Sequence, residues 1–244
     1  MMRPFSLLLC SVFSLLMLLV PGASADLSAQ MHERPSNSLE AINRRKAASH
    51  NDNKRLSDED NALRTVFEYG ECIADRYENR VRPLMTVSMW TFRGKDERSF
   101  IQRRCFSSGL MTLPLQTAVA SVHRAFFIED FEERRMVFAP ESVDFTPLSN
   151  NPSEQEQIHA VHANFAGCIV RADFENARAF VTELPGSVAS NDALMALVPQ
   201  FEPCATEQVA SQMSKTILFA FLAEALHREA LAGLKYGEQS EAAE

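Results

Sequence analysis

The stretch YGECI at residues 69–73 decides the fold, because a close copy of it, FAGCI, stands at residues 165–169. Three further landmarks follow each stretch in the same order: an aromatic-Glu-Asn triplet, a second cysteine and a His-Arg pair. They lie at 77–79, Cys105 and 123–124 in the first half and at 174–176, Cys204 and 227–228 in the second. This order indicates two tandem copies, at residues 58–138 and 155–236, which we expect to pack face to face.

Outside the apolar N-terminal segment, the chain has four cysteines. Four cysteines allow three pairings, and the duplication selects the one in which each copy closes its own bridge, Cys72–Cys105 and Cys168–Cys204. Metal binding is the alternative use of four cysteines. It is disfavoured here because no two of them form the C-x-x-C clip that is usual in structural zinc sites. We therefore expect two disulfides and no metal site.

Apolar spacing predicts helices in both copies. In the first copy, Ser57 is expected to cap a helix whose apolar positions recur at threes and fours as far as Tyr77. The second copy shows the same period from Ile158 to Ala172, and we expect Ser190 or Asn191 to cap a short helix that ends near Pro199. Because strand signals are weak, the predicted fold is all-α: two tandem copies of a roughly three-helix unit, each closed by one disulfide.

The last helix of each copy is unusually apolar. Between Ile217 and Leu226 only Glu224 is charged, and residues 113–128 take the same place in the first copy. A helix that is apolar all round is either buried on several sides or covered by a partner. We therefore expect a protein partner, or self-association through these apolar helix surfaces.

The remaining segments indicate an exported protein. Residues 1–25 form a cleavable secretory signal, with Arg3 before an apolar run and Ala23-Ser24-Ala25 before the cut. We expect a flexible polar linker at 26–57, a linker between the copies at 139–154 and a frayed acidic tail at 237–244. The expected location is periplasmic or secreted, with no membrane span once the signal is cleaved.

The net charge argues against nucleic acid as a partner. The chain carries 24 basic and 32 acidic residues, and cleavage would remove Arg3, which leaves a net charge of about −9. Nucleic-acid binding draws on basic side chains that release phosphate counterions. An acidic chain lacks this driving force, so we expect no nucleic-acid partner.

Two histidine patterns are the candidates for chemistry. The motif Glu224-x-x-His227 resembles half of a helical di-iron site, but the matching position in the first copy has Ala120 in place of the Glu. We expect His123 and His227 at the polar margin of the last helices. His159 and His162 share one helix face and are expected to border a core or an interface. No catalytic, cofactor-binding or metal-binding residue is predicted.

The strings CIVRAD at 168–173, ARAF at 177–180, LPGS at 184–187 and LAEALHR at 222–228 carry a family resemblance. They resemble a group of uncharacterised exported bacterial proteins with paired cysteines and a duplicated helical repeat. The resemblance implies a location in the bacterial envelope, and it implies no activity, cofactor or catalytic residue.

Three classes of function fit these features. The first is a non-catalytic interaction or scaffold protein of the bacterial envelope, which should expose a contiguous apolar patch. The second is a binding protein for a small apolar ligand, with a cavity between the copies lined by Phe219, Phe221, Phe126 and Phe127. The third is an envelope enzyme that uses acidic residues, with a carboxylate of raised pKa in a cleft. We favour the first, and the enzyme stays open as a less favoured alternative.

Overall fold

The structure, a computed structural model, describes residues 56–106, 113–147, 150–205, 209 and 213–241. The predicted signal at 1–25 and all but the last two residues of the predicted linker at 26–57 lie outside the described residues. The described part of the chain is helical and contains no strand. This confirms the predicted all-α class.

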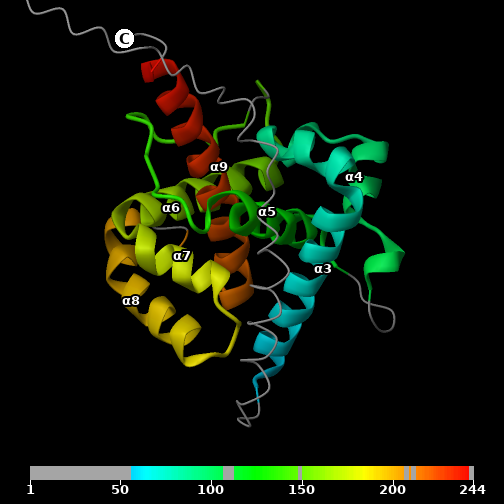
Figure 1. The fold of residues 1–244 in the computed structure, drawn as a ribbon, viewed down its shortest axis with the longest axis horizontal. Coiled ribbons are helices and arrows are strands. Elements are labelled where there is room, and N and C mark those ends of the chain that lie inside the picture. The colour runs from blue at the N-terminus through cyan, green and yellow to red at the C-terminus, as the bar shows by residue number, and fades with distance from the viewer. Residues whose placement is uncertain (1–55, 107–112, 148–149, 206–208, 210–212, 242–244) are drawn as a thin grey trace, which may run out of the picture.

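The elements fall into two halves (Figure 1). The first half contains α3 (Asp58–Val81), the short 3₁₀ helices η1 (Arg82–Thr86) and η2 (Met89–Thr91), α4 (Gly94–Phe100), η3 (Arg103–Cys105) and α5 (Leu115–Phe131). The second half contains α6 (Glu154–Ala172), α7 (Phe174–Thr182), α8 (Val188–Cys204) and α9 (Lys215–Glu241). Within the described ranges, no helix has both the length and the apolar composition needed to cross a membrane.

Each half is closed by its own disulfide, as the sequence predicts. Cys72 on α3 is bonded to Cys105 in η3, and Cys168 on α6 is bonded to Cys204 at the end of α8. In both bridges the Cα atoms are 5.6 Å apart, a usual spacing for a disulfide. Each bridge therefore ties the first helix of its half to the segment that leads into the last helix.

The two last helices, α5 and α9, pack against each other at the centre of the molecule. Helix α5 also packs against α3, and α9 against α6, α7 and α3. Figure 1 shows α9 running through the middle, with α7 and α8 on one side and α3 on the other. This position explains why residues 217–226 lack a broad polar face: other helices of the same chain cover them on several sides.

The two halves share a large hydrophobic core. A large core contains apolar side chains of α6, α7, α8 and α9 together with Leu63, Val66 and Phe67 of α3 and Phe127 and Phe131 of α5. A small core belongs to the first half alone and surrounds its disulfide. The face-to-face packing expected from the sequence thus takes the form of a common interior.

The start of α8 differs from the prediction. Ser187, and not Ser190 or Asn191, caps this helix and accepts the backbone N–H of Ser190, because Gly186 turns the chain there with a φ of 78°. The helix also continues past Pro199 to Cys204. Pro199 is exposed and lies inside α8, as does Pro203, and each lacks the backbone N–H that would continue the helical hydrogen-bond pattern.

The segment between the halves, predicted as a linker at 139–154, is hydrogen-bonded to side chains of α6 and α9. Arg171 donates hydrogen bonds to the carbonyl oxygens of Ala139 and Glu141 and pairs with the fully buried Glu229 at 2.6 Å. Glu229 in turn accepts the backbone N–H of Val143. At the other end of the second half, α9 continues to Glu241, beyond the expected boundary at residue 236. The first part of the predicted tail is therefore helical.

Candidate functional site

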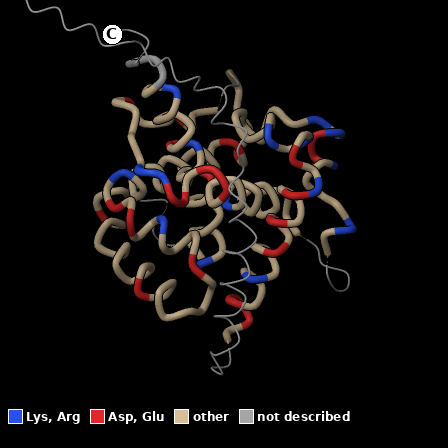
Figure 2. The backbone as a smooth tube through the Cα atoms, viewed as in Figure 1, with Lys and Arg blue, Asp and Glu red and all other residues tan. Residues whose placement is uncertain are grey.

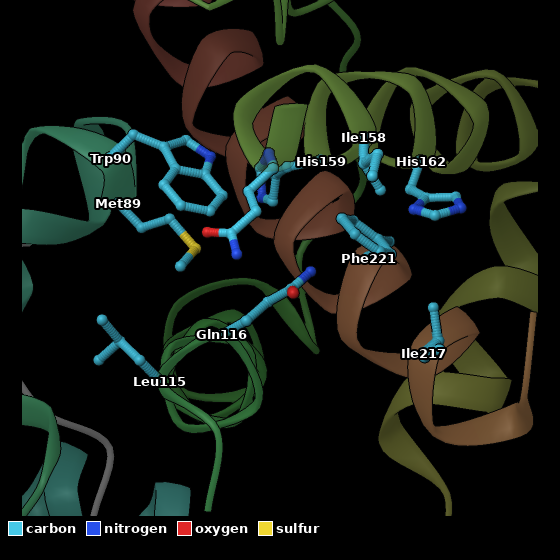
Figure 3. Close-up of a pocket in the computed structure, with 10 residues that line it drawn as sticks. Met89, Trp90, Leu115, Gln116, Ile158, His159, His162, Ile217 and Phe221 are labelled. Carbon is cyan, nitrogen blue, oxygen red and sulfur yellow. The ribbon is translucent and has the colours of Figure 1, made fainter. Parts of the chain in front are cut away.

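A groove of about 540 Å³ lies where four elements of the two halves meet. Its walls come from η2, the first turn of α5, one face of α6 and the first turns of α9 (Figure 3). The residues that line it are Met89, Trp90, Leu115, Gln116, Gln155, Ile158, His159, His162, Ile217 and Phe221. The groove therefore depends on how the two halves are placed against each other.

Local sequence fixes the helix faces that line the groove. Ser153 and Glu156 form a capping box, in which each side chain accepts the backbone N–H of the other residue. This box sets the start of α6, so Gln155, His159 and His162 fall on one face at spacings of four and three residues. Ile217 and Phe221 are four residues apart on α9 and share a face in the same way.

The walls of the groove are largely apolar, and its rim is open to solvent. Ile158 and Ile217 are 48% and 38% exposed, although both are large apolar side chains. Phe221 is buried, and its ring lies 5.2 Å from that of His159 and 5.0 Å from that of His162. Among the described residues that line the groove there is no Asp, Glu, Lys or Arg.

Two nitrogen atoms of groove residues lack hydrogen-bond partners. Trp90 Nε1 and His162 Nδ1 are buried, and neither meets a partner within the described part of the chain. Leaving a buried donor unsatisfied costs about 1–3 kcal/mol, so native proteins rarely leave such groups unpaired. Both atoms belong to residues of the groove, but the atoms themselves are closed off from solvent and so do not face its open space.

Behind the groove, His159 is bonded to a buried carboxylate. His159 Nε2 lies 3.0 Å from Oε2 of Glu224, and the other carboxylate oxygen of Glu224 is 3.5 Å from Arg228. Burial alone would raise the pKa of Glu224. The hydrogen bond to His159 and the electrostatic interactions with His159, His123 and Arg228 outweigh it and lower this pKa to about 2. Glu224 is therefore ionised at neutral pH and holds His159 in place.

A second buried pair lies where α5 crosses α9. His123 Nδ1 and His227 Nδ1 are 2.9 Å apart, and both side chains are 2% exposed. Burial lowers the pKa of His123 to about 4 and that of His227 well below its usual value. At neutral pH both rings are therefore uncharged, and one Nδ1 donates its hydrogen to the other.

The predicted position of these two histidines is wrong. We expected them at a polar margin of the last helices, but α5 and α9 cover each other there and leave no such margin. Glu224 also turns away from His227 in the Glu224-x-x-His227 motif and binds His159 on α6. In the described residues, no group of three or more His, Cys, Asp or Glu side chains is placed to hold a metal ion.

The groove presents two imidazole rings, and one of them is paired with a carboxylate behind it. A His–Glu pair can accept or deliver a proton, but covalent catalysis also needs a nucleophile. No Ser, Thr or Cys is among the described residues that line the groove. Glu224, which is bonded to the lining residue His159, has a lowered pKa, whereas a general acid needs a raised one.

The sequence located part of this site. His159 and His162 border the interface between the halves, as predicted. Of the four phenylalanines expected to line a cavity, only Phe221 does so, while the other three are buried in the cores. Trp90, Gln116 and Gln155 were missed because they belong to helix starts and a short 3₁₀ helix, where no periodicity marks them. The lone charge of Glu224 in an apolar run is a signal from which its buried partner could have been expected, but the sequence analysis did not draw that inference.

None of the protein families, curated proteins or solved structures with which this chain was compared matches it.

Proposed function

We propose that this protein is a non-catalytic, exported binding protein that holds a small, largely apolar molecule in the groove between its halves. The observation that carries this proposal is a groove with largely apolar walls and a rim of exposed apolar side chains. Ligand sites in proteins are typically apolar pockets of about 300–1,000 Å³ with a few polar groups that fix orientation. The groove, at about 540 Å³, falls within this range.

The exposure of the rim supports the same function. Ile158 and Ile217 leave much of their apolar surface exposed to solvent. Covering apolar surface is favourable by about 25 cal/mol per Å². A ligand that lies against these two side chains and Phe221 would gain this contribution.

Two features support export. The N-terminal segment has the composition of a secretory signal, and disulfides such as Cys72–Cys105 and Cys168–Cys204 persist in oxidising compartments. We therefore place the binding function outside the cytoplasm, in the periplasm or the medium.

Trp90 provides a direct test, because it is the only tryptophan of the chain and lines the groove. The oxidised protein would be titrated with N-phenyl-1-naphthylamine, an uncharged apolar dye that accepts excitation energy from tryptophan. We expect saturable energy transfer from Trp90 to the dye. Ile217→Glu places a charge at the rim and should weaken binding at least about tenfold.

Met195→Glu serves as the matched control, because Met195 is 68% exposed on α8, outside the groove. It should leave dye binding unchanged. If the dye does not bind, or if Ile217→Glu binds it as well as the native chain does, the proposed function is wrong.

A second candidate function, interaction with another protein, rests on α8. Val188, Met195 and Val198 are 69%, 68% and 46% exposed, and their spacings of seven and three residues place them on one helix face. Exposed apolar patches often mark protein interfaces. We expect concentration-dependent dimerisation in sedimentation experiments, abolished by Met195→Glu and retained by Ile217→Glu. A strictly monomeric native chain would exclude self-association through this face.

A further inference from the structure

We propose that one end of the molecule binds peripherally to the surface of an anionic lipid membrane. This basic surface lies in α4, in η3 and in the residues between them, and consists of Lys95, Arg98, Ile101, Arg103 and Arg104. All five residues are exposed. The proposal does not depend on the groove. It follows from the local charge of the segment, its fixed backbone and its one exposed apolar side chain.

The charge of this segment is opposite in sign to that of the chain. Residues 93–104 include five basic residues and two acidic ones, a net charge of +3, whereas the whole chain has a formal net charge of −8. Figure 2 shows Lys and Arg gathered at the α4 end of the molecule. Exposed charges more than about 8–10 Å apart are largely screened at physiological salt. A membrane that approaches this end therefore meets mainly the local positive charge.

The four cations of the basic surface are available to a partner. Within the described part of the chain they form no ion pair. Elsewhere, Arg82 and Arg171 are paired with carboxylates. Asp96, an acidic residue of α4, accepts the backbone N–H of Arg93. Anionic lipid headgroups could therefore contact the four cations without breaking an existing ion pair.

Tyr69 of α3 fixes the direction in which this segment points. Its hydroxyl donates to the carbonyl oxygen of Phe100 at 2.6 Å and accepts the backbone N–H of Gln102 at 2.9 Å. Phe100 is fully buried, and the first disulfide holds Cys105 against α3. With its neighbours on both sides held inward, Ile101 faces outward and is 48% exposed.

An exposed isoleucine among cations fits a membrane better than a protein partner. Basic side chains are attracted to the headgroups of an anionic bilayer, and an apolar side chain beside them can enter the boundary between headgroups and acyl chains. A stable protein interface needs about 1,000 Å² of complementary surface with an apolar centre. The basic surface has one apolar residue, Ile101, and a lipid surface requires no complementary shape.

Co-sedimentation with lipid vesicles tests the proposal. The oxidised protein without its predicted signal would be mixed with vesicles of phosphatidylcholine alone or of phosphatidylcholine and phosphatidylglycerol in equal parts. We expect binding at least about tenfold tighter to the anionic vesicles, because the cations are attracted only to these. Added salt should weaken this binding, since it screens the attraction.

Arg103→Gln with Arg104→Gln removes two cations of the basic surface and should weaken binding to the anionic vesicles at least about tenfold. Arg178→Gln with Lys235→Gln is the matched control, because it changes the net charge equally on α7 and α9, away from α4 in Figure 1. It should leave binding unchanged. Ile101→Ser should weaken binding several-fold, because less apolar surface enters the bilayer.

A measurement on the native chain decides the question even if a variant does not fold. In bicelles with spin-labelled phosphatidylglycerol, the methyl resonances of Ile101 should broaden. Those of Val188, which is 69% exposed on α8, should not. Equal broadening of both residues, equal binding to neutral and anionic vesicles, or an equal effect of the two double variants overturns the proposal. Equally tight binding of polyglutamate would indicate an acidic protein partner instead and also overturns it. The groove is tested separately by the dye.

Discussion

Arg171 and Glu229 show what a buried charge requires of its neighbours. The carboxylate of Glu229 is fully buried and is bonded to Arg171 at 3.0 Å and 2.6 Å. We expect Arg171→Met to lower the free energy of unfolding by about 3–5 kcal/mol, because it leaves a buried charge without compensation. Urea denaturation would measure this loss. The double variant Arg171→Met with Glu229→Leu removes both charges and should recover most of it.

Arg178 provides the control for this substitution. It pairs with Glu175, whose side chain is 71% exposed, and such surface pairs contribute about 0–1 kcal/mol. Arg178→Met should therefore change the stability little. A loss of less than 1 kcal/mol for Arg171→Met as well would mean that Glu229 does not need its partner.

The His123–His227 pair predicts a loss of stability on mild acidification. The pKa of His123 is about 4 in the folded state against 6.5 in the unfolded state, so between these values the unfolded state binds more protons. The free energy of unfolding should therefore fall as the pH falls from 6.5 to 4, by roughly 3 kcal/mol from His123 alone. His159, Glu224, Arg228 and Arg82 are the charged or titratable groups that act on this pair.

Urea denaturation at several pH values between 7 and 4.5 would test this dependence. Glu224 contributes only below this window, because its pKa moves from 4.5 to about 2 on folding. Replacing both rings, with His123→Phe and His227→Leu, should flatten the profile. A native chain of equal stability at pH 7 and 4.5 would contradict the burial of this pair as neutral rings.

At the scale of helices, Gly70 sets how closely α3 approaches α5. A Cβ atom built on Gly70 would lie 2.3 Å from the carbonyl oxygen of Ser121, which is a backbone atom and cannot easily move. We expect Gly70→Ala to force the helices apart and to cost about 2–5 kcal/mol, as other severe core disruptions do. Thermal or urea unfolding, followed by circular dichroism, would measure the loss.

Gly237 on α9 is the matched control, because a Cβ atom there would meet nothing within 4 Å. Alanine is the better helix former by about 1 kcal/mol, so Gly237→Ala should be neutral or stabilising. If Gly70→Ala behaves like Gly237→Ala, the close approach of α3 and α5 is not required.

Elements whose signals are local could be predicted from the sequence. The Ser57 cap and the apolar face of α3 are each encoded within a few turns, and both were predicted correctly. The two disulfides were predictable because the order of the landmarks repeats. The cap of α8 was misplaced because several serines and an asparagine lie close together, and only the turn at Gly186 decides among them.

The groove could not be predicted in the same way. Its residues come from four elements, and their meeting depends on the packing of α5, α6 and α9 rather than on any one stretch. Trp90 illustrates this, since a single aromatic residue in a short 3₁₀ helix belongs to no periodicity or motif that would predict a binding site. Histidines 159 and 162 were noticed because they share a helix face, which is a local signal.

At the scale of the whole molecule, the shared core predicts cooperative folding. Phe67 of α3 packs against Phe219 of α9 with 4.6 Å between the ring centroids, and the buried Arg124 of α5 donates to the carbonyl oxygens of Val181 and Thr182 at the end of α7. These contacts join the halves across the interior. The two halves should therefore unfold together, even though each has its own disulfide.

Removal of one disulfide tests this cooperativity. Replacing Cys168 and Cys204 together by serine leaves no free thiol and opens a loop of 36 residues, which should cost about 4 kcal/mol in the chain-entropy model. If the halves fold as one unit, the loss must also appear in the first half. Amide hydrogen exchange at Ile73 reports on that half alone, because Ile73 is fully buried in the small core beside the other disulfide. If exchange at Ile73 occurs through global unfolding, we expect it to be faster in the double serine variant than in the native chain. Unchanged exchange at Ile73 would mean that the shared core does not couple the halves.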